Sequence, residues 1–243
     1  GVANPGYIWN IKDVMKRAEA GEKLTIGFIG GSITQGSLSS TPQKCYAYLV
    51  YEWWVRTFPQ AEFKYVNAGI GGTTSQFGVA RAQDDLLDAE PDFVIAEFSV
   101  NDESTGHFEE TYEGLVRKIL SSKSHPALML VHNVCYNNGA SAELVHSRIA
   151  RHYNIPSVSM QSTLYKALLN CRFDNRRITP DDLHPNDCGH ELVSMVITKR
   201  LEQIKNTVKA EYETAKSQRA AAQSAPGAID SQCLRGFGKI PEL

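Results

Sequence analysis

Short apolar runs alternate with longer amphipathic segments along the chain, and this alternation sharply narrows the folds open to it. Near-continuous apolar character is typical of parallel strands that are buried on both faces of a sheet. Each intervening segment is long enough for a crossover helix. The predicted strands are residues 23–29, 62–68, 92–98, 126–133 and 155–160.

Amphipathic segments with helix stop signals fill most of the intervals between these strands. Gly21 and Pro59 mark the ends of the first two helices. The predicted helices are residues 10–21, 43–58, 75–90, 108–122, 140–153 and about 187–218. Alternating strands and helices predict a three-layer α/β/α, flavodoxin-like fold around a five-stranded parallel sheet with right-handed crossovers.

The length and the loss of apolar periodicity near the carboxyl end predict the domain organisation. A chain of 243 residues, 42% of them hydrophobic, is sufficient for one α/β domain. From about residue 216 the sequence "AKSQRAAAQSAPGAIDSQ" loses its apolar period. We therefore predict a domain over residues 1–218 and a linker or docking tail over 219–243, which can lead to an accessory module absent from this chain.

Charge and cysteine content exclude several classes of partner. The net charge is -2 and the Lys and Arg residues are scattered, so the sequence does not predict a basic patch that would bind nucleic acid or an acidic membrane. No apolar run approaches the ~18 residues of a membrane span. Five cysteines without a CxxC pair favour neither a disulfide framework nor a metal, and favour the cytoplasm. Cys135 and Cys171 flank or follow apolar segments and are expected to be buried apolar residues. Because the opening "GVANPG" can be a trimmed terminus, secretion stays open as an alternative.

Ser32 lies in a glycine-rich loop, "GGSITQG", directly after the first predicted strand. Such a loop can turn sharply and let a ligand approach its backbone. A phosphate-binding loop requires a lysine after Gly36, and Ser37 stands there instead. The GxSxG elbow of α/β-hydrolases requires a glycine where Thr34 stands. A nucleophilic serine and a plain turn serine both remain open.

A possible base for Ser32 occurs far along the chain, in "TPDDLHPNDCGHELV". A serine hydroxyl becomes nucleophilic when a base removes its proton, and that base needs an orienting carboxylate. Asp181 and His184 can supply both groups from one turn, immediately before a predicted helix. The DxxH spacing alone is common in loops and helix caps, so its meaning depends on the other motifs.

Two further motifs follow predicted strands: "NAGIGGTT" at 67–74 and "SVND" at 99–102. With the two stretches above, they form four blocks in the order found in SGNH hydrolases, also called GDSL-like esterases, which this chain resembles over residues 27–190. The resemblance implies Ser32 as nucleophile, His184 as base and Asp181 as its orienter. It also implies an oxyanion hole of the Ser32 amide, the Gly72 amide and the Asn101 side chain.

The chain departs from the usual family pattern at two positions. Gly31 replaces the aspartate before the serine, and Ser99 replaces the glycine of GxND. Neither change removes a catalytic group. The "GGSIT" form of the first block, after an amino-terminal helix, is similar to that of bacterial esterases that remove O-acetyl groups from mannan or xylan.

We therefore expect a serine esterase that deacetylates plant-type polysaccharides or oligosaccharides through an acyl-serine intermediate, without a cofactor or metal. Hydrogen-bonding loops after the third and fourth strands suit a hydroxylated substrate. A lysophospholipase or thioesterase is the alternative enzyme, and a flavodoxin-like binding module is the non-enzymatic alternative. The resemblance also allows for a carbohydrate-binding module in the full-length protein, and the oligomeric state is not predicted.

Several ionisable residues near these motifs are expected to be structural. Glu97 interrupts an apolar strand and requires hydrogen-bond partners if it is buried. Asp102 is expected to hold its own loop. His190 lies within the helix after His184 and is expected to pack or cap rather than act as a second base.

Overall fold

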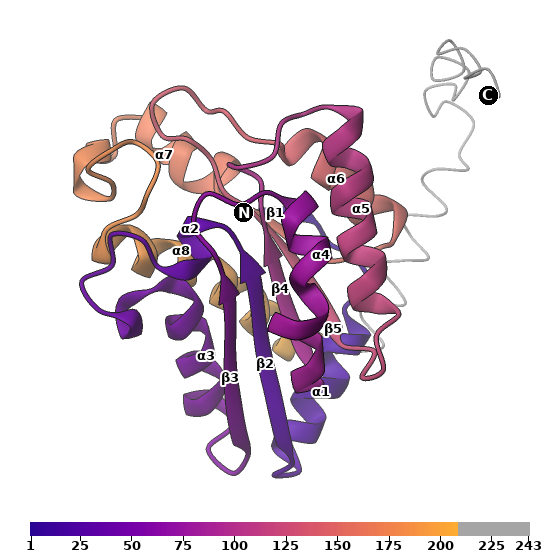
Figure 1. Ribbon diagram of the computed structural model, residues 1–243. Helices are drawn as coiled ribbons and strands as arrows, with labels where there is room; N and C mark the ends of the chain where they lie inside the picture. The colour runs from indigo at the N-terminus through magenta and orange to yellow at the C-terminus, as the bar shows by residue number, and fades with distance from the viewer. Residues whose placement is uncertain (209–243) are drawn as a thin grey trace, which may run out of the picture. The chain divides into compact units, whose positions relative to one another are not determined.

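A six-stranded sheet runs through the computed structural model, which describes residues 1–208 (Figure 1). The strand order is β1-β6-β5-β4-β2-β3. The strands are β1 (Val2–Asn4), β2 (Lys23–Gly30), β3 (Glu62–Gly69), β4 (Phe93–Glu97), β5 (Ala127–His132) and β6 (Ser157–Ser159). Strands β2 to β6 pair in parallel, which confirms the predicted five-stranded parallel sheet.

The sixth strand corrects the predicted strand count. Strand β1 pairs antiparallel with β6 at the edge of the sheet. The buried side chain of Asn4 donates hydrogen bonds to the carbonyl oxygens of Ala150, at 3.0 Å, and Ile155, at 2.8 Å. A three-residue strand followed by Pro5 has no periodicity, so the sequence gives no signal for it.

Helices cover both faces of the sheet (Figure 1). Helices α4 (Ser75–Asp85), α5 (Gly106–Leu120) and α6 (Glu143–His152) lie on one face. Helices α1 (Trp9–Glu19), α3 (Tyr46–Thr57) and α8 (Asp187–Asn206) lie on the other. The short elements are α2 (Ser32–Gln35), α7 (Lys166–Leu169), the 3-10 turns Pro42–Lys44, Leu87–Ala89 and Asn175–Arg177, and the π-turn Gln161–Tyr165. The three-layer α/β/α prediction is confirmed.

Buried side chains lock each helix layer onto the sheet. Tyr112 and Leu115 of α5 pack against Val94 and Leu130 of the sheet within one apolar cluster. On the opposite face Trp54 of α3 is fully buried, and its ring lies 5.4 Å from that of Phe93. Each such large side chain stabilises the fold by roughly 1.5 to 3 kcal/mol relative to an exposed one.

Helix α8 is shorter than the predicted segment that began at residue 187. It ends at Asn206, and the two following described residues are not helical. Residues Gly1–Lys205 form one compact unit. The predicted domain boundary at 218 and the predicted tail over 219–243 lie outside the described residues. Cys233 lies there too.

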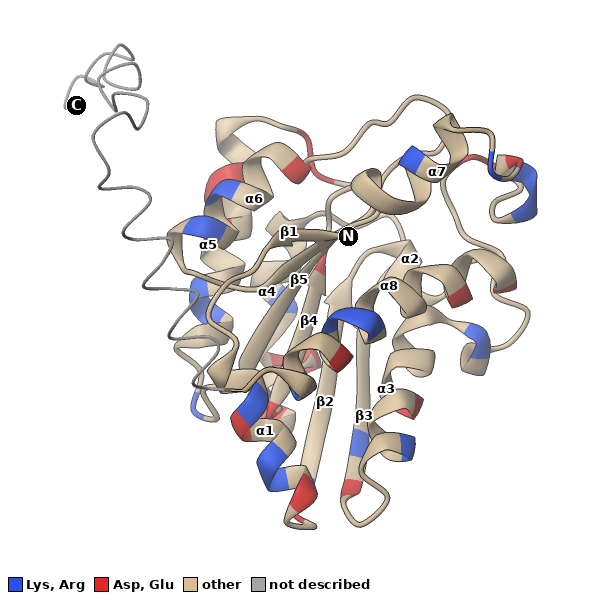
Figure 2. Cartoon of the chain, turned by 180° about the vertical axis from the view of Figure 1, so that it is seen from behind, with Lys and Arg blue, Asp and Glu red and all other residues tan. Residues whose placement is uncertain are grey.

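Charges of both signs are spread over the surface of the described unit. Figure 2 shows Lys and Arg interspersed with Asp and Glu along the helices, and neither sign gathers on one face in that view. Among residues 1–208, no helix is both long and apolar enough to cross a bilayer.

Candidate functional site

The carboxyl ends of three neighbouring strands carry the predicted site residues. Ser32 begins α2 after β2, Gly72 lies after β3, and Asn101 lies after β4. Because β3, β2 and β4 are adjacent and parallel, these ends meet at one edge of the sheet. Ligands bind at this edge in open α/β sheets.

Ser32, His184 and Asp181 form a continuous hydrogen-bonded chain. Ser32 Oγ lies 2.9 Å from His184 Nε2, and His184 Nδ1 lies 2.7 Å from Asp181 Oδ2. A carboxylate only accepts hydrogen bonds, so Nδ1 carries the imidazole proton and Nε2 is free to accept from the serine hydroxyl. The structure thus brings together all three residues that the sequence predicts, although 152 positions separate the serine from the histidine.

The hydrogen bonds at Asp181 keep its carboxyl ionised. Partial burial by itself would raise the pKa of Asp181, but the hydrogen bond from the His184 ring, together with the backbone N–H groups of His184 and Leu183, outweighs it. The pKa falls to about 2. Both N–H groups donate to Oδ1, at 2.7 Å and 3.1 Å. Asp181 is therefore a carboxylate throughout the neutral range.

The loop that carries His184 is fixed by residues on either side of it. Asp182 accepts hydrogen bonds from Asn175 Nδ2 at 2.6 Å and from the Arg176 guanidinium at 3.1 Å. Asn186 accepts from the backbone N–H of Gly189 at 3.0 Å, and so caps the first turn of α8. Asp182 thus orders the loop, whereas its neighbour Asp181 contacts the imidazole.

The loop after β3 turns beside Ser32 and exposes its backbone. A Cβ built on Gly71 would lie 3.6 Å from Ser32 Cβ, so this loop borders the serine directly. Gln35 Oε1 accepts from the Gly71 N–H at 2.8 Å and anchors the turn. Gly72 has a φ of +70°, which favours glycine, and no atom lies within 4 Å of its ideal Cβ position. Gly71 and Gly72 are both exposed, so the backbone of this turn is accessible beside Ser32.

Asn101 packs against the backbone of Gly31. A Cβ on Gly31 would lie only 2.3 Å from Asn101 Oδ1, so any larger residue at position 31 would displace the Asn101 side chain. Glycine before the serine therefore leaves room for the Asn101 side chain in this chain.

Ser99, the second departure, binds the buried carboxyl of Glu97. Glu97 Oε1 lies 3.0 Å from the Ser99 backbone N–H and 3.1 Å from Ser99 Oγ. Ser99 Oγ also lies 3.1 Å from the Asn133 carbonyl oxygen, but it has one proton for these two acceptors. A protonated Glu97 resolves the conflict, because it can donate to Ser99 while Ser99 donates to Asn133.

Burial raises the pKa of Glu97 to about 7, against the lowering effect of the Ser99 hydrogen bonds. Between about pH 4.5 and 7, Glu97 therefore keeps its proton in the folded protein but has lost it in the unfolded chain. The contribution of Glu97 to the free energy of unfolding falls as the pH rises through this window, and it is constant above the window. The expected structural role of Glu97 agrees with its full burial and its place outside the Ser32 hydrogen-bond chain.

We expect Glu97→Gln to remove this pH dependence. The amide resembles the protonated acid, so the variant should be more stable relative to wild type at pH 8 than at pH 5, by about 2 to 3 kcal/mol. Urea unfolding at both pH values measures the difference. Exposed Glu110 on α5 offers a matched Glu→Gln control that should show no such change. Equal pH dependence in wild type and Glu97→Gln would contradict the assignment.

His190 bridges two loops, as its expected structural role requires. Its Nδ1 lies 3.3 Å from the Tyr46 backbone N–H, and its Nε2 lies 3.3 Å from the Ser37 carbonyl oxygen. Burial lowers the pKa of His190 to about 4, so the ring is neutral with both nitrogens paired. It therefore packs between α3 and the loop after α2.

Sequence reasoning missed two residues that support the site. Gln35 anchors Gly71, and Arg81 donates a hydrogen bond to the Gly30 carbonyl oxygen at 3.1 Å. Arg81 is buried although it lies on a helix predicted from an amphipathic pattern. Neither residue has a spacing that signals its role, because each acts on backbone groups that only the tertiary fold brings near.

A cavity of about 470 Å³ opens beside Asn101. Its lining includes Glu103, Ser104, Cys135 and Ser141. The sequence predicted Cys135 and Cys171 to be buried apolar residues, but Cys135 is partly exposed and Cys171 is exposed. Among residues 1–208, no three His, Cys, Asp or Glu side chains form a group that could hold a metal ion.

Comparison with solved structures finds close relatives. One is a two-domain esterase (CEX) active on acetylated mannans, co-crystallised with mannopentaose. It is 68% identical with a TM-score of 0.85, over 85% of this chain and 56% of that chain. This chain thus spans little more than half of that two-domain protein. Axe2, an acetylxylan esterase from Geobacillus stearothermophilus, is 19% identical with a TM-score of 0.61, over 78% of this chain and 97% of that chain, and shares the fold.

Comparisons of sequence lead to the same family. Thioesterase 1/protease 1/lysophospholipase L1 of Escherichia coli (strain K12) is 26% identical over 201 residues, which cover 78% of this chain and 88% of that protein. Residues 28–192 match the family model of the GDSL-like lipase/acylhydrolases, and this span holds all five predicted site residues. The chain therefore belongs to the GDSL-like lipase/acylhydrolase family.

Proposed function

We propose that this chain is a serine esterase that removes O-acetyl groups from plant-type polysaccharides or oligosaccharides such as mannan and xylan. The observation that carries the proposal is the hydrogen-bonded chain from Ser32 Oγ through His184 to Asp181, with contacts of 2.9 Å and 2.7 Å. This arrangement lies at the edge of the sheet where the loops after β2, β3 and β4 meet.

The first half of the reaction acylates Ser32. His184 Nε2 takes the hydroxyl proton as Ser32 Oγ attacks the acetyl carbonyl carbon, and a tetrahedral intermediate forms. The intermediate collapses as the sugar hydroxyl leaves and receives the proton from His184. The acetyl group stays on Ser32. In the second half, His184 activates a water molecule that releases acetate and restores the serine.

We assign three hydrogen-bond donors to the negative oxygen of the intermediate: the Ser32 N–H, the Gly72 N–H and the Asn101 side-chain amide. Ser32 is the first residue of α2, so its backbone N–H has no partner within that helix. No atom lies within 4 Å of the ideal Cβ position of Gly72, and the Asn101 side chain lies against Gly31. Each donor in an oxyanion hole contributes roughly 2.7 to 4 kcal/mol to the lowering of the barrier.

The carbohydrate substrate is supported by two independent observations. The relative at 68% identity acts on acetylated mannans, and its crystals contain mannopentaose. The cavity beside Asn101 carries the hydroxyl and carboxyl groups of Ser104, Ser141 and Glu103. Such a lining favours hydrogen bonds to sugar hydroxyls over contacts with a long alkyl chain.

A long-chain acyl hydrolase is the second candidate, because the Escherichia coli relative is a thioesterase and lysophospholipase. The two candidates share every proposed catalytic residue and differ in the acyl group and the leaving group. They are therefore separated by substrate preference and not by mutation of the triad.

The deciding experiment measures acetate release from acetylated manno- and xylo-oligosaccharides beside hydrolysis of 4-nitrophenyl esters. We expect rapid acetate release from the sugars and a rate that falls steeply from acetyl to butyryl to octanoyl esters. Reactions with Ser32→Ala serve as the blank for every substrate. A rate that rises with acyl length, without acetate release from sugars, would favour the second candidate.

A further inference from the structure

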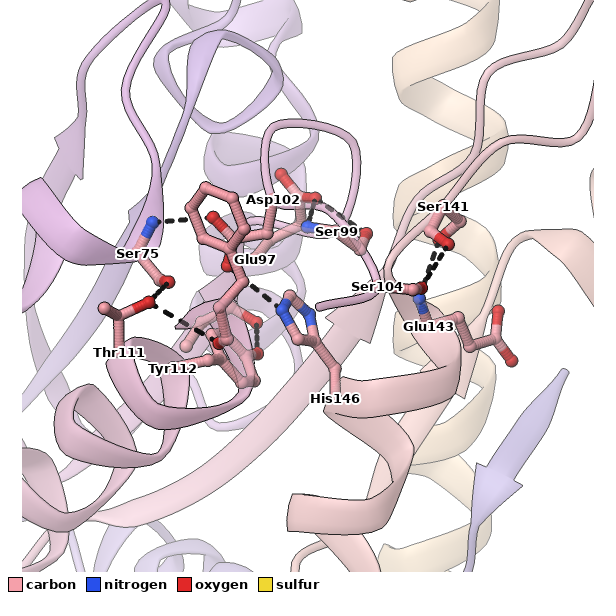
Figure 3. A network of polar contacts seen from close by, with 12 residues as sticks. Ser75, Glu97, Ser99, Asp102, Ser104, Thr111, Tyr112, Ser141, Glu143 and His146 are labelled. Carbon is pink, nitrogen blue, oxygen red and sulfur yellow. Dashed lines mark hydrogen bonds and ion pairs between the residues drawn. The ribbon is translucent and has the colours of Figure 1, made fainter. Parts of the chain in front are cut away.

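The buried carboxylate of Asp102 contacts Ser75 and His146 (Figure 3). Asp102 follows Asn101, and its side chain is fully shielded from solvent. Its Oδ1 accepts from the Ser75 backbone N–H at 2.9 Å, and its Oδ2 lies 3.1 Å from His146 Nε2. The single carboxylate therefore joins three segments that are distant in the sequence.

The first of these contacts reaches the loop that carries Gly72. Ser75 is the first residue of α4, three positions after Gly72. The N-cap residue of this helix, Thr74, makes no side-chain capping hydrogen bond. Asp102 supplies the missing acceptor from another loop, and its negative charge also suits the amino end of a helix. The position of the Gly72 loop thus depends on Asp102.

The second contact fixes the carboxylate itself. The His146 side chain is fully buried, and its ring stacks on Tyr112 with centroids 3.6 Å apart and planes 9° apart. Burial lowers the pKa of His146, against the raising effect of Asp102, so the imidazole is neutral. Its Nδ1 has no hydrogen-bond partner among the described residues. The one ring proton therefore resides on Nε2 and is donated to Asp102.

These contacts set the spacing between two proposed oxyanion donors. Asn101 lies one residue from the bridging carboxylate on one loop, and Gly72 lies three residues from Ser75 on the other. We propose that Asp102 and His146 are positioning residues of the oxyanion hole, which hold the Asn101 amide and the Gly72 N–H at the spacing that the tetrahedral intermediate requires. This inference rests on the proposed esterase function and deepens it.

The principal test replaces Asp102 with asparagine. The amide retains an acceptor for the Ser75 N–H but turns an NH₂ group toward His146 Nε2–H, or forces a proton onto the unpartnered Nδ1. We expect kcat for 4-nitrophenyl acetate to fall on the order of 10- to 100-fold, because small displacements of catalytic groups have effects of this size. KM should change much less, since the donors act chiefly in the transition state.

The inhibition constant of a boronic acid distinguishes a positioning role from a purely structural one, because loss of stability alone would not change it. Phenylboronic acid bonds to the serine oxygen and places a negative tetrahedral centre in the oxyanion hole. Its inhibition constant should rise in Asp102→Asn by about the factor by which kcat/KM falls, as expected for an analogue of the transition state. Thermal unfolding measured in parallel reports any loss of stability.

Two substitutions at His146 test the same contact from the other side. His146→Leu removes the donor to Asp102, whereas His146→Gln retains an N–H donor of similar reach. We expect His146→Leu to lower kcat as much as Asp102→Asn does. The kcat of His146→Gln should be at least threefold higher than that of His146→Leu. Tyr112→Phe is the matched control, because it removes a hydroxyl that bonds to the Ala96 carbonyl oxygen at 3.4 Å and keeps the ring under His146.

Tyr112→Phe should lower the melting temperature without changing kcat or boronate affinity. If Asp102→Asn and His146→Leu behave like this control, with lower stability but wild-type kcat and inhibition constant, the inference is overturned and the esterase proposal stands. If wild-type ester hydrolysis does not depend on Ser32, the proposed function fails, and the inference fails with it.

Discussion

Ser32→Ala is expected to reduce kcat for acetyl esters by roughly 10⁴- to 10⁶-fold, the range seen when a catalytic nucleophile is removed. Ser32 Oγ lies 2.9 Å from His184 Nε2, so it is the hydroxyl that this base can deprotonate. Alanine deletes one oxygen from a largely buried position and leaves the backbone N–H in place. Rates on 4-nitrophenyl acetate, measured with the purified variant, check the expectation.

Folding and labelling controls make this result specific to the nucleophile. Ser121→Ala alters an exposed serine at the end of α5 and should retain wild-type activity. The Ser32→Ala protein should unfold within about 1 kcal/mol of wild type, because no core packing is lost. A serine-directed organophosphate should add its mass to the peptide that contains Ser32 in wild type alone. Wild-type rates in Ser32→Ala would contradict the mechanism.

The layers of the fold are predictable because each depends on a local pattern. Strands such as Phe93–Glu97 and Ala127–His132 are buried at every residue, and a near-continuous apolar run in the sequence indicates that burial. Helix α1 places Ile11, Val14, Met15 and Ala18 on one face, at helical spacing. Strand β1 has neither signal, because three edge residues are ordered by pairing with β6 and by the Asn4 side chain.

The candidate site is predictable in part, for a different reason. Ser32, His184 and Asp181 occupy motifs whose residue types are dictated by the chemistry, so their identity is visible in the chain. Their 2.9 Å and 2.7 Å contacts arise from the topology, which brings the loop before α8 to the end of β2. The sequence therefore predicts which three residues form the site, and the parallel order of the strands brings these residues together.

Residues that act on backbone groups cannot be found in this way. Asp102 accepts from the Ser75 N–H, and Gln35 accepts from the Gly71 N–H. A backbone donor has no sequence signature, so the pairing of an acceptor with it is known only from the fold. The role of Gly31 is hidden similarly, because its missing side chain matters only where Asn101 fills the space.

The two partners of Ser32 are expected to differ in the size of their effects. His184→Ala removes the base that contacts Ser32 Oγ and should lower kcat by about 10⁶-fold. Asp181→Asn should lower it by about 10⁴-fold, because the base remains but is held in the wrong tautomer. The asparagine amide would donate to His184 Nδ1 and move the ring proton to Nε2, which then cannot accept from Ser32.

The loop itself should survive the asparagine substitution, and this makes the comparison informative. Asp181 Oδ1 accepts from the backbone N–H groups of His184 and Leu183, and an asparagine oxygen can retain both contacts. Loss of activity in Asp181→Asn would then reflect proton placement and not a disordered loop.

Asp182→Asn is the matched control, because Asp182 binds Asn175 and Arg176 and does not contact the imidazole. Its kcat should exceed that of Asp181→Asn by at least 100-fold, on the scale of the tautomer effect. Measurement of kcat for all three variants on one acetyl ester decides the order, and an Asp181→Asn enzyme as active as wild type would remove the carboxylate from the mechanism.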